Sequence, residues 1–155
     1  MDKDAQLQAI LAAGRHIHAA VDTIDALVSV RLGVHRNDLR CLHLLQKGPA
    51  TPAQVAGYTG LTSGSVTALI DRLETGGLVE RRRSVSDRRS VEVAIPQARV
   101  AEIGAHRSEI EQAIRDHFST RPAAEIADTA VALDRFADFL DAFALRFAVG
   151  CPDKP

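Results

Sequence analysis

The segment 51–96 constrains the fold most strongly, because its residues follow the spacing of a helix-turn-helix with a β-hairpin behind it. Ala56 supplies the small side chain that is needed where two helices cross. Gly60 follows four residues later, where a tight turn requires a residue that tolerates a positive φ. Leu61, Val66 and Leu69 offer the apolar contacts that would close the corner between the helices.

Both helices of this motif have clear start signals. Thr51 and Gln54 form a capping-box pattern, with Pro52 at the first helical position between them. Thr62 is a second capping residue, and the helix after it is expected to run to about Thr75. The sequence therefore predicts two short helices joined by a tight turn.

The hairpin is predicted from two short runs of residues, Val79 to Arg83 and Ser90 to Ile95. In the second run, apolar residues alternate with others, which is typical of a strand with one buried face. The alternating apolar residues are Val91, Val93 and Ile95.

Four further helices are predicted around the motif, because apolar residues recur there at spacings of three and four. They cover about residues 4–30, 37–45, 97–117 and 120–147, with Asn37 capping the second and Ser119 or Thr120 capping the last. The stripe of the first helix comprises Leu7, Ile10, Leu11, Ile17, Val21, Ile24 and Val28, and that of the last comprises Ile126, Ala130, Leu133, Phe136, Leu140, Phe143 and Phe147.

These elements predict a mainly α fold with a small β-wing, in which a winged helix-turn-helix is flanked by N- and C-terminal dimerisation helices. We expect one intertwined domain, with an N-terminal dimerisation helix at 1–34, a DNA-binding region at 35–96 and C-terminal dimerisation helices at 97–155. The chain has 155 residues, 46% of them hydrophobic, which is enough for a core of its own. The two long apolar stripes are too extensive to be covered by the small DNA-binding region, so we expect a homodimer. The alternative is that the stripes pack only against each other within one subunit.

The net charge of −1 does not favour nucleic acid, but the charge is unevenly distributed. The hairpin segment 79–90 carries five Arg against Glu80 and Asp87, whereas residues 100–155 carry more acidic than basic side chains. This distribution predicts a localised anion-binding surface at the hairpin.

Short polar side chains at the start of the second motif helix would hydrogen-bond phosphates or base edges, and the hairpin Arg would reach the minor groove of double-stranded DNA. Asp87 would orient Arg89 by a charge-assisted hydrogen bond. The predicted DNA-binding residues are Thr62, Ser63, Ser65, Thr67, Arg72, Arg81, Arg83, Asp87, Arg88 and Arg89.

The order of these motifs resembles the MarR (multiple antibiotic resistance regulator) family of bacterial transcription factors. The resemblance rests on Leu61-Thr62, Val66-Thr67, Asp71-Arg72-Leu73-Glu74, Gly77-Leu78-Val79, Arg81 and above all Asp87-Arg88-Arg89 followed by Val93 and Ile95. It implies a transcriptional regulator, usually a repressor, that binds a pseudo-palindromic operator as a homodimer. It also implies release from DNA when a small-molecule effector or an oxidant is sensed.

Alternatives within the same fold are a thiol- or metal-responsive sensor and a winged helix that contacts proteins without binding DNA. Cys41 lies among leucines and is predicted to be a structural thiol, with a redox switch as the alternative. Cys151 is too distant in sequence to suggest a disulfide framework. The six His show no short ligand spacing, so neither a metal nor a cofactor is predicted.

Enzymatic activity is not expected, because the sequence has no nucleophile elbow, phosphate-binding glycine loop or paired catalytic carboxylates. No signal peptide and no apolar run of membrane-spanning length is visible. We therefore expect a cytoplasmic protein without a membrane partner.

Overall fold

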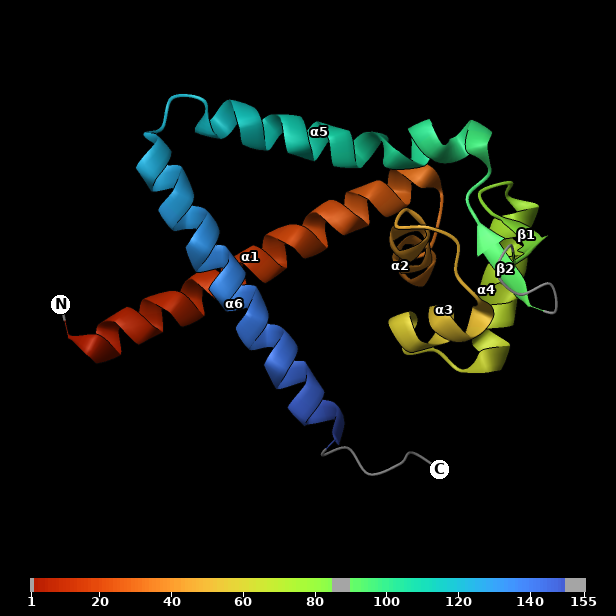
Figure 1. Ribbon diagram of the computed structural model, residues 1–155, viewed down its shortest axis with the longest axis horizontal. Coiled ribbons are helices and arrows are strands. Elements are labelled where there is room, and N and C mark those ends of the chain that lie inside the picture. Colours follow the sequence, from red (N-terminus) through yellow and green to blue (C-terminus); the bar gives the residue numbers. More distant parts are fainter. Residues whose placement is uncertain (1, 85–89, 150–155) are drawn as a thin grey trace. The chain divides into compact units, whose positions relative to one another are not determined.

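The computed structural model describes residues 2–84 and 90–149, which form six α-helices, a 3-10 turn and a two-stranded antiparallel sheet (Figure 1). The elements are α1 (Lys3–Leu32), α2 (Arg36–Leu45), α3 (Pro52–Thr59), α4 (Ser63–Thr75), β1 (Glu80–Arg83), β2 (Val91–Ala94), η1 (Gln97–Arg99), α5 (Val100–Phe118) and α6 (Ala123–Val149). The predicted class, mainly α with a small β-wing, is confirmed.

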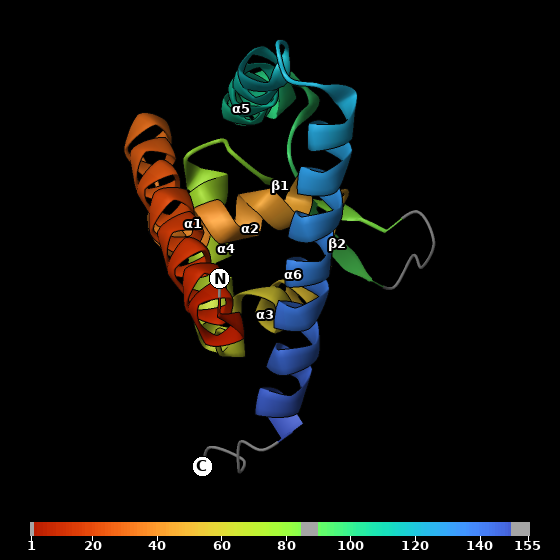
Figure 2. The ribbon, with the colours of Figure 1, turned by 90° about the vertical axis from the view of Figure 1, so that its left-hand side faces the viewer.

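The chain divides into two compact units, Met1–Ser108 and Glu109–Pro155. The first holds the helix-turn-helix and the hairpin, and Figure 2 shows the two strands projecting from the group formed by α2, α3 and α4. The second holds the end of α5 and all of α6. The assignment of separate dimerisation and DNA-binding roles to parts of the chain stays a prediction.

The helix-turn-helix corner forms through the predicted local signals. The Gln54 N–H donates to Thr51 Oγ1 over 3.2 Å, and the Thr51 N–H donates to Gln54 Oε1 over 2.8 Å. Gly60 ends α3 at a φ of 73°, a value that L side chains rarely adopt. Thr62 then caps α4 by accepting the Ser65 N–H. These contacts need only neighbouring residues, so the sequence was sufficient to predict them.

The core of the first unit is almost entirely aliphatic. Each large aliphatic side chain that is removed from water contributes about 1.5–3 kcal/mol. The buried cluster comprises Cys41, Leu42, Leu45, Ala50, Val55, Val66, Leu69, Ile70, Leu73, Leu78, Val79, Val93 and Ile103. It joins α2, α3 and α4 to the base of the hairpin and to the start of α5.

The start of α2 corrects one prediction. Asn37 does not cap this helix, which begins at Arg36 with His35 as the preceding extended residue. The His35 N–H donates to Asp38 Oδ2 over 3.1 Å, so a carboxylate inside the first turn satisfies the amide. Asn37 is therefore part of the helix.

The start of α6 corrects a second prediction, because neither Ser119 nor Thr120 caps it. The helix begins at Ala123, and the Pro122 carbonyl accepts its first backbone hydrogen bond, from Ile126. The Ser119 hydroxyl instead donates to the Asp116 carbonyl at the end of α5. A hydroxyl in a short connection between helices can serve either end, and here it serves the earlier helix.

The hairpin pairs Glu80 with Ala94 and Arg83 with Val91, but burial along β2 does not alternate as predicted. Val93 and Ala94 are both buried, whereas Val91 is exposed. The reason is that Val93 also exchanges two backbone hydrogen bonds with Ala50, which anchors the base of the hairpin in the core. Residues of β2 that lie close to this base are therefore buried, and Val91, which lies farther along the hairpin, is exposed.

The long helices leave large apolar side chains exposed. The α1 stripe residues Leu7, Ile10, Leu11, Ile17, Val21 and Ile24 are between 39% and 53% exposed. None of the side chains that the structure describes in α6 is buried. Even so, across residues 2–84 and 90–149 no helix is long and apolar enough to span a bilayer.

Candidate nucleic-acid interface

The first turns of α4 present short hydroxyl side chains to solvent. Ser63, Ser65 and Thr67 are all exposed, as predicted for a reading surface. Thr62 Oγ1 donates to Ser65 Oγ over 3.0 Å, and Thr67 Oγ1 donates to the Ser63 carbonyl over 3.1 Å. Because each hydroxyl oxygen keeps acceptor capacity and Ser65 keeps its proton, the set can still meet donors and acceptors on DNA.

The opposite face of α4 is fixed in the core, which determines which side chains it presents. Val66, Leu69, Ile70 and Leu73 are each at most 2% exposed. Rotation of the helix about its axis would remove these side chains from their contacts. The hydroxyl-bearing face is therefore held outward by packing.

Arg72, one of the predicted DNA-binding residues, has a partner within the protein. Its Nε donates to Asp38 Oδ2 over 3.0 Å and its Nη2 donates to Asp38 Oδ1 over 2.5 Å. Asp38 lies on α2 with its side chain 1% exposed. Asp38 was not among the predicted site residues, although an acidic residue next to the apolar face of a helix is a usable signal of a buried pair.

Arg81 is likewise held by carboxylates from α4. Its Nη2 donates to Asp71 Oδ1 over 2.5 Å, and its Nη1 and backbone N–H both donate to the Glu74 carboxylate. These contacts fasten the first strand of the hairpin to the last turns of α4. Arg81 thus joins the two parts of the site that the sequence assigned to DNA binding.

The remaining basic residues lie along the hairpin. Arg83, and Arg82 beside it, are exposed on β1. The predicted Asp87, Arg88 and Arg89 lie outside the described residues. The structure therefore brings the hydroxyls of α4 and the guanidinium groups of β1 into one compact unit.

Cys41 is fully buried in the core, as predicted for a structural thiol. Burial, assisted by the charge of Asp38, raises the pKa of the Cys41 thiol to about 12. The reactive thiolate is thus strongly disfavoured near neutral pH. Among the described residues, no cluster of three or more His, Cys, Asp or Glu side chains is arranged to hold a metal ion.

Two His side chains meet where α2 packs beside α5, with the ring centroids of His43 and His106 5.7 Å apart. Burial lowers the pKa of His43 below its usual value, and the positive charges of His106 and Arg107 act in the same direction. The charge of Asp25 opposes this shift. The folded protein therefore favours neutral His43.

We expect acidification to destabilise the fold through His43. A His with a lowered folded-state pKa contributes stability fully above its unfolded pKa of about 6.5, and loses it as the pH falls below that value. The urea concentration at the unfolding midpoint should be lower at pH 5.5 than at pH 7.5. In His43→Gln this difference between the two pH values should be smaller. His18→Gln, at an exposed site on α1, should keep the wild-type dependence. An unchanged pH dependence in His43→Gln would contradict the assignment.

The fold and the site define a winged helix-turn-helix protein in which α4 carries exposed hydroxyl groups and the hairpin carries Arg side chains. Residues 32–90 match the model of the MarR family. Over these residues the chain is similar to the MarR family.

Known proteins show similarity of the same kind. The chain is 46% identical over 66 residues to the uncharacterized HTH-type transcriptional regulator YcgE of Bacillus subtilis, and the match covers 42% of each protein. A MarR family protein from Bacillus stearothermophilus superposes with a TM-score of 0.73 at 17% identity, covering 91% of this chain and 99% of that one. Streptococcus pneumoniae FabT in complex with DNA superposes with a TM-score of 0.66 at 22% identity, covering 86% and 99%. At these identities the two structures show the shared fold.

Proposed function

We propose that the protein is a DNA-binding transcriptional regulator. The observation that carries the proposal is the outward-facing hydroxyl set of α4, fastened through Arg81 to a hairpin that carries further Arg side chains. A short-side-chain helix fits the major groove, and Arg side chains favour the negative potential of the minor groove. The similarity to FabT, solved in complex with DNA, supports the same use of the fold. Such a regulator would act in the cytoplasm.

Within this proposal the predicted residues divide by role. Thr62, Ser63, Ser65 and Thr67 read DNA or position its phosphates at the start of α4, where the helix dipole also favours an anion. On the wing, Arg83, Arg88 and Arg89 provide the electrostatic contacts, with Asp87 orienting Arg89. These roles assign DNA binding to residues 35–96.

The protein would bind a pseudo-palindromic operator as a homodimer. The exposed apolar side chains of α1 and α6 support this, because patches of this extent in a water-soluble protein mark interaction surfaces. Residues 1–34 and 97–155 would then supply the dimerisation helices. A two-fold axis would set two copies of α4 about 34 Å apart, one turn of DNA.

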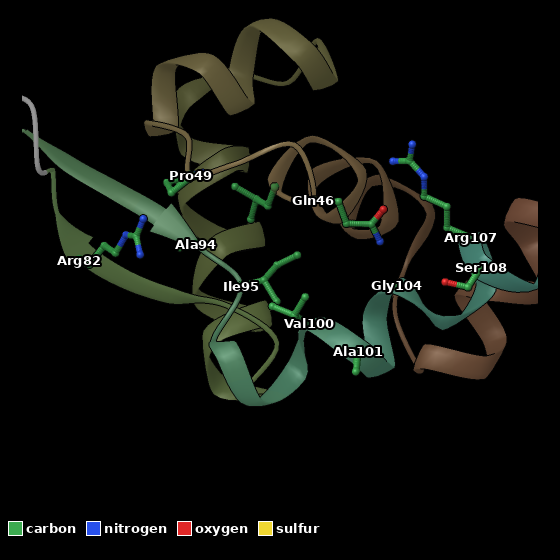
Figure 3. Close-up of a pocket in the computed structure, with 11 residues that line it drawn as sticks. Gln46, Pro49, Arg82, Ala94, Ile95, Val100, Ala101, Gly104, Arg107 and Ser108 are labelled. Carbon is green, nitrogen blue, oxygen red and sulfur yellow. The ribbon is translucent and has the colours of Figure 1, made fainter. Parts of the chain in front are cut away.

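A small-molecule effector would release the protein from DNA, and the first unit has a cavity of suitable size. The cavity has a volume of about 510 Å³ and lies between the end of α2, the hairpin and the start of α5. Figure 3 shows Ile95 and Val100 between Arg82 at one end and Arg107 at the other. Apolar walls with guanidinium groups favour a ligand with an apolar body and a negative charge. Because Arg82 lies on β1, a ligand bound in the cavity would contact the hairpin directly and could change its position.

Selection of bound duplexes from random DNA tests the proposal directly. We expect a pseudo-palindrome whose half-sites are centred about 10 base pairs apart, and steep loss of affinity with salt. Absence of binding to any duplex would instead favour a winged helix that contacts proteins. The genes adjoining the selected sites would show whether the outcome is repression.

The wing and the reading helix should respond differently to substitution. Arg89→Ala is expected to weaken operator binding by about 1–3 kcal/mol and to flatten the salt dependence, because one counterion-releasing contact is lost. Ser65→Ala should instead change the preferred sequence and leave the salt slope as it was. Fluorescence anisotropy across a salt series measures both quantities. Equal losses on all sequences in both variants would refute this division of roles.

A further inference from the structure

The contact between Asp38 and Arg72 is more than a surface ion pair. The Asp38 carboxylate is 1% exposed and accepts from two nitrogens of Arg72 and from the His35 N–H. Both oxygens of the Asp38 carboxylate are therefore hydrogen-bonded, and its charge is compensated by the Arg72 guanidinium. The two residues are 34 positions apart and join α2 to the last turn of α4.

We propose that Asp38 and Arg72 form a clamp that positions α4 on α2, and that Arg72 serves DNA recognition through this clamp instead of contacting DNA. The inference rests on the proposed DNA-binding function and assigns Asp38 a role in it. Asp38 and Arg72 are thus positioning residues, and the contacts to DNA come from the other end of α4.

The energetics keep Arg72 in place. Its planar fork donates through two nitrogens to one carboxylate, the geometry in which Arg pairs most strongly. Turning the guanidinium toward a DNA phosphate would leave Asp38 charged, buried and unpaired, and an uncompensated buried charge is strongly unfavourable. The phosphate contact would have to offset that cost, although Arg72 is itself 48% exposed.

The position of the clamp explains how it would affect specificity. Arg72 lies nine residues after Ser63, which at 1.5 Å per residue is about 13 Å along the helix axis. A tilt of about 5° at the clamp would therefore move the first turn of α4 by about 1 Å. A displacement of this size is comparable to the tolerance of a productive binding geometry. The apolar face of α4 resists rotation, whereas the clamp fixes the tilt of its far end.

The test compares Arg72→Lys and Arg72→Met with the wild type on the selected operator and on an unrelated duplex, across a salt series. Lys keeps the charge but cannot form the bidentate pair. The clamp predicts that both variants lose about 10- to 100-fold of operator affinity, while affinity for the unrelated duplex and the salt slope stay unchanged. A phosphate contact predicts that Lys behaves like the wild type. It also predicts that Met weakens both duplexes equally and reduces the slope by about 0.9. That second pattern would overturn the proposal.

Asp38→Asn tests the other partner of the clamp. It should also lower operator affinity, and the double variant with Arg72→Met should bind no more weakly than Asp38→Asn alone, because the clamp is already broken. Additive losses would overturn the proposal. Circular dichroism of each variant shows that the fold is retained, and Arg115→Met, at an exposed α5 position, controls for loss of one positive charge. If the wild type bound no duplex, the proposed function would fail. A coupling of Asp38 and Arg72 in urea unfolding would then still establish the pair as structural only.

Discussion

Leu140→Glu is expected to convert the proposed homodimer to a monomer and to abolish tight operator binding. Leu140 belongs to the α6 apolar stripe and is 47% exposed. A charge placed on a surface that is buried in a dimer must lose its hydration without gaining a partner. Because each half-site is held with the help of the other, loss of the dimer should reduce operator affinity by about 10²- to 10⁴-fold.

Ala142→Glu is the matched control, since it introduces the same side chain two positions away. Two helical residues at this spacing point in nearly opposite directions, so Ala142 lies away from the stripe. It should leave the dimer intact. Light scattering at micromolar concentration measures the mass of each variant, and a dimeric Leu140→Glu would exclude this face of α6 from the interface.

Leu69→Ala is expected to cost about 2–5 kcal/mol of unfolding free energy, the largest effect that we expect from a single core substitution. Leu69 is 1% exposed and packs in the cluster beneath α4. Truncation removes its contacts and leaves a cavity that close-packed neighbours cannot fill. Since the same packing directs the hydroxyls of α4 outward, loss of operator binding should accompany the loss of stability.

Val91→Ala also truncates an apolar side chain, at a hairpin site that is 48% exposed and lies outside the proposed dimerisation helices. It should alter the free energy of unfolding by no more than about 0.5 kcal/mol, as is usual for surface positions. Urea unfolding followed by circular dichroism compares the two variants. Equal destabilisation at both sites would contradict the assignment of the core to the α2–α4 cluster.

Much of the fold could be predicted from the sequence, because the decisive signals were local. The capping box at Thr51, the turn at Gly60 and the cap at Thr62 each depend on groups within four residues of one another. The same was true of the helical patterns that defined the long helices. Two capping predictions failed, at Asn37 and at the start of α6, and so did the predicted alternation of burial along β2.

The candidate site could be predicted only in part. The hydroxyls of α4 were correctly predicted to be exposed, since their helical face follows from the apolar positions beside them. The partners of Arg72 and Arg81 were not predicted. Asp38 lies 34 residues from Arg72, and local spacing contains no information about which carboxylate such an Arg will meet. Burial of Ala94 was missed for the same reason, because it depends on the pairing of Val93 with Ala50.

The sequence by itself determined the class of fold, the order of its elements and the residues that α4 presents outward. Those features follow from backbone preferences and from the separation of apolar and polar side chains, which act over a few residues. The tertiary structure alone decided which charged groups are paired within the protein. Ion pairing depends on distances that are set when α2, α4 and the hairpin pack together, and in this protein it holds Arg72 and Arg81 against carboxylates of the winged helix itself.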